Sequence, residues 1–145
     1  MQILSIILPH ENQLIIAKQL FQHGANVSGV SNPCGRTPLH GACYSGIVTN
    51  LDFVQYLLEE GADANAQDHS RYTPLMSTIP YAPSAAKFLL NWPTMDANIT
   101  SESGASFLAV VRRTLTTSSE QLHDQFLIQQ WTAIEEMLVE RGALD

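Results

Sequence analysis

The chain is poor in positive charge. Only seven of its 145 residues are lysine or arginine, against fourteen aspartate or glutamate, so the formal net charge is −7. A field of that sign repels phosphate backbones, and seven cations can neutralise few phosphates. We therefore expect no nucleic-acid partner.

Long apolar runs and cysteines are also scarce. No stretch approaches the roughly 18 to 20 apolar residues that a helix needs to span a bilayer. The apolar opening, residues 1–10, lacks a preceding basic region and a small-residue cleavage site. Cys34 and Cys43 are two thiols in a chain large enough to bury its own core, so no disulfide framework is indicated. We expect no membrane contact and a cytoplasmic or nuclear location.

The residue patterns of catalysis and metal binding are largely missing as well. The eight glycines never form a phosphate-binding loop of the GxGxxG or GxxxxGK type. A zinc site needs three or four ligands at close spacing, but the five histidines and two cysteines are scattered along the chain. We expect no cofactor and no metal, in a single folded domain with 45% hydrophobic residues.

What the chain does contain is a repeated phrase. The segment HGANVSGVSNPCGRTPLHGAC, residues 23–43, is echoed by EGADANAQDHSRYTPLMSTI, residues 60–79. Thr37 and Thr73 lie 36 residues apart, and Ser106, in the weaker echo SGASFLAVV, lies another 33 beyond. A period near 33 with a Gly-Ala-Asp/Asn start and a Thr-Pro-Leu core resembles the ankyrin repeat. The resemblance covers nearly the whole chain and weakens at both ends.

This resemblance implies an all-α fold. The ankyrin-repeat solenoid stacks antiparallel helix pairs joined by finger-like hairpin loops. Residues 1–145 would form one such domain, with approximate repeats at 1–34, 35–70, 71–103 and 104–145.

Local signals agree with this reading. Thr37 is placed to cap a helix that begins at Pro38, and a second helix, about Leu51 to Glu60, should stop at Gly61. The finger, Ala62 to Tyr72, is rich in residues that favour turns. Two residues before Thr-Pro the first finger has Gly35, whereas the next has Arg71, which would cost about 1 kcal/mol if the backbone there needs a positive φ.

The last two repeats look irregular. Pro80 and Pro83 lie between the two helical runs of the third repeat, so its inner helix should be short. In the fourth, Ser118 followed by Gln121 resembles a capping box for one helix from about Ser119 to Glu140, roughly 33 Å long. Such a helix would overhang the stack, either as a C-terminal cap or as a grip on a partner.

His40 and Cys43 leave two interpretations open. The resemblance implies a structural histidine in the Thr-Pro-Leu-His position, bonded to neighbouring turn backbone, and a cysteine packed between repeats. The alternative is a small enzyme in which the two residues pair a thiol with a base. We favour the structural role, and expect no enzyme.

The resemblance also implies a function, the binding of another protein on a concave surface lined by finger tips and inner helices. We expect Tyr72, Arg36 and Tyr44 to contribute most, because tyrosine and arginine combine contact area with polar groups. The matching positions for the whole surface are Pro33, Cys34, Arg36, Tyr44, Ser45, His69, Ser70, Arg71, Tyr72, Tyr81, Glu102 and Ala105.

A second function class stays open. The chain could be the ankyrin segment of a longer multidomain protein whose main activity lies elsewhere. The first repeat, with Ile3, Leu4, Ile6, Ile7 and Leu8, is more apolar than a terminal repeat should be. We therefore expect further repeats, self-association or inward folding at that end.

Overall fold

The computed structural model describes residues 10–30, 32–44, 50–121 and 125–143, and this part of the chain is helical without strands. The apolar residues of the first repeat, Ile3, Leu4, Ile6, Ile7 and Leu8, lie outside the described residues, so the expectation attached to them stays a prediction. The helices, in chain order, are α1 (His10–Gln22), α2 (Pro38–Tyr44), α3 (Leu51–Glu59), α4 (Pro74–Ser77), α5 (Pro83–Leu90), α6 (Phe107–Gln121) and α7 (Gln125–Glu140).

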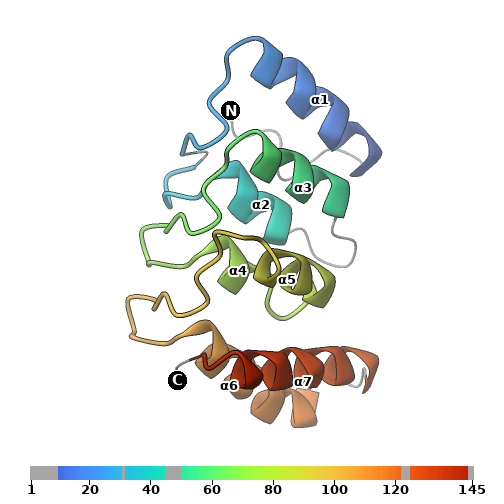
Figure 1. Cartoon of the computed structure of the whole chain (residues 1–145), viewed down its shortest axis with the longest axis vertical. Helices are drawn as coiled ribbons and strands as arrows, with labels where there is room; N and C mark the ends of the chain where they lie inside the picture. Colours follow the sequence, from blue (N-terminus) through green and yellow to red (C-terminus); the bar gives the residue numbers. More distant parts are fainter. Residues whose placement is uncertain (1–9, 31, 45–49, 122–124, 144–145) are drawn as a thin grey trace.

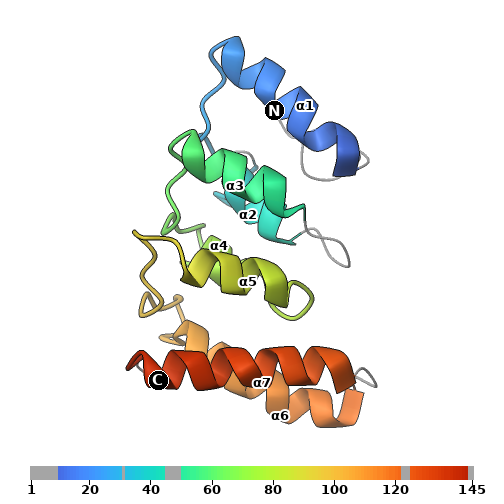
Figure 2. The same cartoon turned by 45° about the vertical axis from the view of Figure 1, so that its right-hand side comes forward.

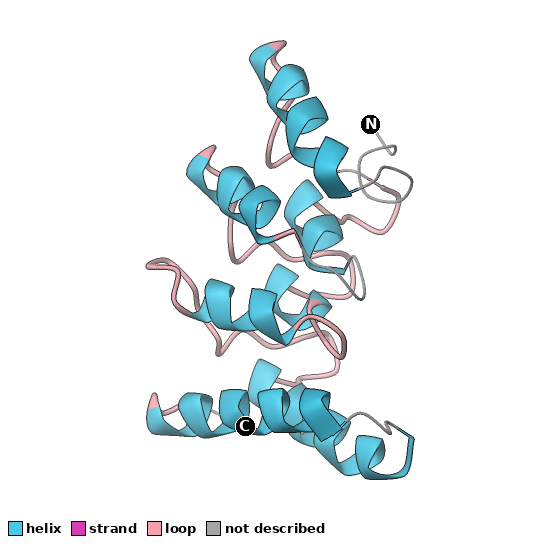
Figure 3. Cartoon of the chain, turned by 90° about the vertical axis from the view of Figure 1, so that its right-hand side faces the viewer, coloured by secondary structure: helices cyan, strands magenta, loops and turns pink. Residues whose placement is uncertain are grey.

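The helices form two layers that run the length of an elongated stack (Figure 1). In the outer layer α1 contacts α3, α3 contacts α5 and α5 contacts α7. In the inner layer α2 contacts α4 and α4 contacts α6. Figure 3 shows these layers as two columns of helices, and Figure 2 shows the loops between successive pairs on one side. The all-α solenoid of helix pairs is confirmed, whereas the repeat boundaries stay a prediction.

The inner helices begin where the sequence predicts. Thr73 Oγ1 accepts a hydrogen bond from Met76 N at 3.3 Å, and Ser106 Oγ accepts one from Ala109 N at 3.1 Å. Both bonds satisfy backbone donors of the first helical turn. At Thr37 the hydroxyl instead lies 2.9 Å from His40 Nδ1, which also accepts from Thr37 N at 3.2 Å, so the predicted capping bond is replaced by contacts with a histidine.

Outer helices end at glycines in the left-handed region. Gly24, Gly61 and Gly142 have φ of 85°, 91° and 73°. At Gly61 the chain turns with bonds from Gly61 N to Leu58 O at 3.1 Å and from Ala62 N to Leu57 O at 2.9 Å. This turn satisfies the last helical carbonyls, so the predicted stop at Gly61 is confirmed.

The third helix pair has the short inner helix that its prolines predict. α4 is four residues long, and Thr78 Oγ1 donates to Leu75 O at its end. One detail differs from the prediction, because Pro83 does not lie between the helices but is the first residue of α5. A proline fits there because the first helical N–H has no acceptor within the helix.

The predicted single helix from Ser119 to Glu140 is wrong. α6 continues to Gln121 and α7 begins at Gln125, so Ser118 and Gln121 lie inside a helix and form no capping box at its start. The serine and threonine run remains helical because hydroxyls bond back to the preceding turn, as Thr114 Oγ1 does to Val110 O at 2.9 Å. The last pair thus has two long helices, α6 of 15 residues and α7 of 16 residues.

The core is a continuous apolar seam between the layers. One cluster of apolar side chains contains four residues that are at most 1% exposed, namely Leu57, Leu75, Leu89 and Ile134. Trp131 closes the seam from α7, with its ring edge against Phe107. The exposed residues of α7 include Glu136 and Glu140 together with the apolar Phe126 and Val139.

Candidate binding surface

The loops between helix pairs carry three finger tips of the same backbone shape. Gly35, Arg71 and Gly104 have φ of 79°, 60° and 78°. Each N–H bonds the carbonyl three residues earlier, at 3.1, 2.8 and 2.9 Å. Arg71 therefore adopts the glycine conformation, which the sequence left open, at a cost of about 1 kcal/mol. Both backbone groups of Arg71 are hydrogen-bonded, its N–H to Asp68 O and its carbonyl to Gln67 Nε2, and these bonds help the turn to keep this conformation.

Neighbouring finger tips are joined through their backbones. His69 N donates to Cys34 O at 2.9 Å, and Glu102 N donates to Ser70 O at 3.0 Å. The His69 ring also packs so closely over Gly35 that a Cβ there would overlap it. The tips therefore form one row with a fixed spacing (Figure 1).

Asp68 organises the second finger tip. Its Oδ1 accepts from Ser70 N and Tyr72 N, each at 2.9 Å, and its Oδ2 lies 3.3 Å from Arg36 Nε. The carboxylate is 5% exposed, so this ion pair is shielded from water on one side. The Arg36 guanidinium in turn lies over the Tyr44 ring, 5.2 Å from its centroid. One carboxylate thus positions two side chains of the predicted surface.

His40 ties the inner helix α2 to the next finger. His40 Nε2 lies 2.9 Å from Tyr72 O, and because a carbonyl can only accept, this nitrogen carries the proton. His40 Nδ1 then accepts from Thr37 N at 3.2 Å and from Thr37 Oγ1 at 2.9 Å. The structural role predicted for His40 is confirmed.

This arrangement predicts a pH dependence of stability. Burial lowers the pKa of His40 below its ordinary value, although the Tyr72 carbonyl opposes this effect. The unfolded chain, with a histidine pKa of about 6.5, therefore takes up more protons than the folded chain as the pH falls below that value. We expect the free energy of unfolding to decrease on acidification from neutral pH through that range.

The measurement is urea unfolding at a series of pH values. The variant His40→Gln should show a shallower pH dependence than the unaltered chain, because it lacks the titrating ring. His23→Gln, which changes an exposed histidine on α1's C-terminal side, is the control. An unchanged slope in His40→Gln would contradict the buried neutral state.

Most of the predicted surface residues are accessible. We call the finger tips, residues 32–36, 68–72 and 101–105, together with Tyr44, Tyr81 and Arg113, the finger face. Ser45 lies outside the described residues. Of the others, Arg36, Tyr72 and Ala105 are half-buried, and the exposed ones are Pro33, Cys34, Tyr44, His69, Ser70, Arg71, Tyr81 and Glu102.

Tyr72 is less exposed than its neighbours at the second finger tip, and Arg113 is an exposed residue that the predicted surface did not include. The Tyr72 ring packs against the core cluster, so its loss would disturb folding as well as recognition. Arg113, which the sequence reasoning missed, is exposed on α6, seven residues after Ser106. Tyr44 stands seven residues after Thr37, so the shared helical register places Arg113 on the same side of the inner layer. The repeat spacing alone could have identified it.

The Cys43 and His40 pair has no geometry for nucleophilic chemistry. Cys43 is 1% exposed, and burial raises its pKa well above the ordinary value, which disfavours the reactive thiolate. Both ring nitrogens of His40 are occupied by Thr37 and Tyr72. In the part of the chain that the structure describes, no three metal-binding side chains gather.

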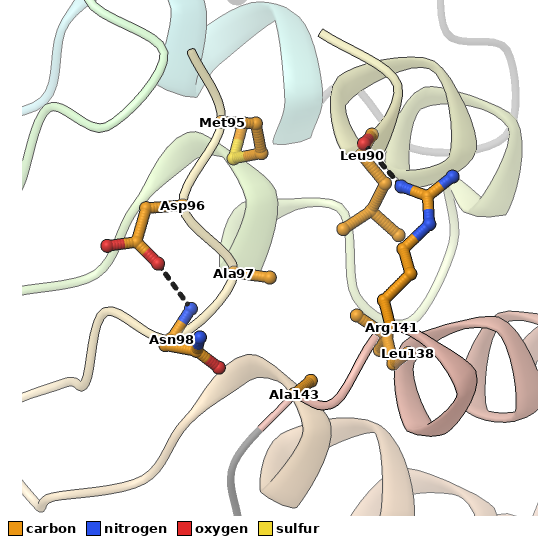
Figure 4. Close-up of a pocket in the computed structure, with 8 residues that line it drawn as sticks. All are labelled: Leu90, Met95, Asp96, Ala97, Asn98, Leu138, Arg141 and Ala143. Carbon is orange, nitrogen blue, oxygen red and sulfur yellow. Dashed lines mark hydrogen bonds between the residues drawn. The ribbon is translucent and has the colours of Figure 1, made fainter. Parts of the chain in front are cut away.

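A cleft of about 230 Å³ lies where α7 ends beside α5 (Figure 4). Arg141 crosses it and donates to Leu90 O at 2.7 Å and to Asn91 Oδ1 at 2.8 Å. These bonds satisfy the end of α5, which lacks the glycine stop of the other outer helices. The polar groups of the cleft therefore serve the fold, and the finger face remains the candidate site.

Within the described ranges, no helix is both long and apolar enough to cross a membrane.

Comparison with known proteins agrees with this architecture. A family model described as ankyrin repeats in three copies matches residues 4–103. Similar curated proteins include the potassium channel AKT3 of Oryza sativa subsp. japonica, 38% identical over 64 residues, and the serine/threonine-protein kinase VIK of Arabidopsis thaliana, 38% identical over 66 residues. The matched segments cover 44% and 46% of this chain but only 7% and 14% of those relatives.

Proposed function

Because this chain belongs to the ankyrin-repeat family, a family of interaction modules, we propose that it binds a partner protein through the finger face. One observation carries the proposal. The finger tips are held in a row by backbone hydrogen bonds, so the backbone that carries their exposed side chains needs no rearrangement before contact. A pre-ordered backbone loses little entropy on binding. In this proposal the chain is not an enzyme, takes no cofactor and works in the cytoplasm or nucleus, without nucleic acid or membrane.

Tyr44 is the residue whose loss tests the proposal best. Its ring is 64% exposed and is oriented by the Arg36 guanidinium. We expect Tyr44→Ala to weaken partner binding about tenfold, since an interface tyrosine often contributes 1 kcal/mol or more. Unfolding of the free chain should hardly change, because an exposed ring buries little area. Tyr72 is unsuitable for this test because its ring is half-buried.

The experiment begins with affinity purification of the partner on the unaltered chain. Calorimetry with the purified partner then compares Tyr44→Ala with Val139→Ala, which removes an exposed apolar side chain from the outer surface of α7. Selective loss in Tyr44→Ala supports the finger face. Equal affinity for both variants would place recognition on another surface.

A second proposal concerns the whole protein. The curated relatives are a channel and a kinase in which the matched segment is a small share of the length. This observation favours an ankyrin segment of a multidomain protein whose main activity lies outside these residues. The mass of the endogenous protein on an immunoblot tests it, since a species of 16.0 kDa alone would refute it.

A further inference from the structure

We propose that the finger face takes an acidic peptide segment of its partner. The inference rests on the proposed function and names the chemistry of the occupant. Its basis is the group of arginines on this face of an acidic chain. Although the net charge is −7, the cations Arg36, Arg71 and Arg113 all belong to the finger face.

Two of these arginines have unused hydrogen-bonding capacity. Arg36 is already paired with Asp68. Arg71, at the second finger tip, and Arg113, on α6, are exposed, and neither guanidinium forms a hydrogen bond or ion pair within the described residues. Arg112, by contrast, is bound to Glu135 at 2.9 Å. Within the described residues, the charges of Arg71 and Arg113 are therefore not neutralised by an ion pair.

Most exposed carboxylates of the described helices lie away from the finger tips. The exposed acids of α3 and α7 lie in the outer layer, whereas Asp63 and Asp96 lie early in the loops that carry the second and third finger tips. On the finger face the described acids are Asp68, which is buried and bonded, and Glu102, which is exposed. Exposed charges farther apart than about 8 Å are largely screened at physiological ionic strength. The finger face therefore presents local positive charge within an acidic chain.

The chemistry of the occupant follows from the groups offered. A guanidinium binds a carboxylate through two parallel hydrogen bonds. Tyr44, which is 64% exposed and lies against the Arg36 guanidinium, offers aromatic contact area on the same face. Aspartate or glutamate side chains spaced along an extended peptide would match this combination of arginines and an aromatic ring. A basic segment would meet repulsion at Arg71 and Arg113.

The test uses three fluorescein-labelled peptides of equal length, which are rich in glutamate, in glutamine or in lysine at the same positions. We expect the glutamate peptide to bind at least about tenfold more tightly than the others, and to weaken as NaCl rises. Arg71→Glu and Arg113→Glu should each weaken it by about tenfold. Glu102→Gln should strengthen it, because it removes the exposed carboxylate of this face.

Lys18→Glu is the matched control. It makes the same change in net charge on the outer helix α1, where Lys18 lies over the Tyr56 ring. We expect it to alter binding less than twofold. If Lys18→Glu weakens binding as much as Arg113→Glu, total charge and not the finger face attracts the peptide, and the proposal fails.

The remaining outcomes separate this inference from the proposed function. If the glutamine or the lysine peptide binds best, and its binding is lost in Tyr44→Ala, the proposal of an acidic occupant is wrong but the finger face is still the binding surface. Binding of none of the three peptides overturns the acidic occupant as well. Partner binding that is insensitive to Tyr44→Ala overturns the finger face itself.

Discussion

Replacing Trp131 by alanine should lower the free energy of unfolding by about 3 to 5 kcal/mol, the range for truncating a large buried aromatic. The ring is 2% exposed, and its Nε1 donates to Pro80 O at 2.8 Å. Its edge meets Phe107, with centroids 6.3 Å apart. The variant would therefore lose packing and leave a carbonyl without its donor.

The site of Trp131 makes a second effect testable. The indole joins α7 to the connection between α4 and α5, so it couples the last helix pair to the rest of the stack. Stacked repeats unfold together only while such interfaces are strong. We expect Trp131→Ala to broaden urea unfolding or divide it into two transitions.

Two variants separate the causes. Trp131→Phe keeps an aromatic ring but removes the hydrogen bond to Pro80, and it should lose less than Trp131→Ala. Val139→Ala on the same helix changes a side chain that is 51% exposed and should stay within about 0.5 kcal/mol of the unaltered chain. A small loss in Trp131→Ala would show that the last pair is not held by this residue.

Asp68→Ala should be almost as costly, at about 2 to 4 kcal/mol. The carboxylate accepts from Ser70 N and Tyr72 N and pairs with Arg36, so alanine would leave three donors unsatisfied. The second finger tip should loosen, and the Arg36 guanidinium should lose its position over Tyr44. Urea unfolding and hydrogen exchange of the finger amides measure the two effects.

The first finger supplies the control for this prediction. There Asn32 Oδ1 accepts from Cys34 N at 3.0 Å and from Arg36 N at 3.1 Å, which are the bonds that Asp68 Oδ1 makes one finger later. Asp68→Asn should therefore keep the turn and lose only the ion pair, at about 1 kcal/mol. Equal losses in Asp68→Asn and Asp68→Ala would mean that the charge, and not the turn, stabilises the finger.

The repeated helix pairs were predictable because their signals are local. Thr73 with Pro74 starts a helix and Gly61 stops one through bonds within a few residues. The positive φ of Arg71 was also predictable, since register alone assigns it the place of Gly35. Such features depend on backbone geometry that each repeat reproduces.

The last pair was mispredicted because local preference and tertiary packing disagree there. Ser118 reads as a helix start, yet the chain continues in α6 because packing against α7 and back-bonding hydroxyls favour the helix. The ion pair between Arg36 and Asp68 joins residues 32 positions apart, so composition could indicate a turn at Asp68 but not its partner. The partial burial of the Tyr72 ring could not be predicted for the same reason, since burial is decided by distant neighbours.

The amide bonds from one finger tip to the next have an evolutionary consequence. They join backbone atoms, the N–H groups of His69 and Glu102 and the carbonyls of Cys34 and Ser70. Every residue except proline has both of these backbone groups. Exposed side chains at these tips, unlike the buried Asp68 and Gly35, can therefore mutate while the distance between neighbouring tips is preserved. New specificities can arise on this scaffold by substitution alone, without any redesign of the helices beneath.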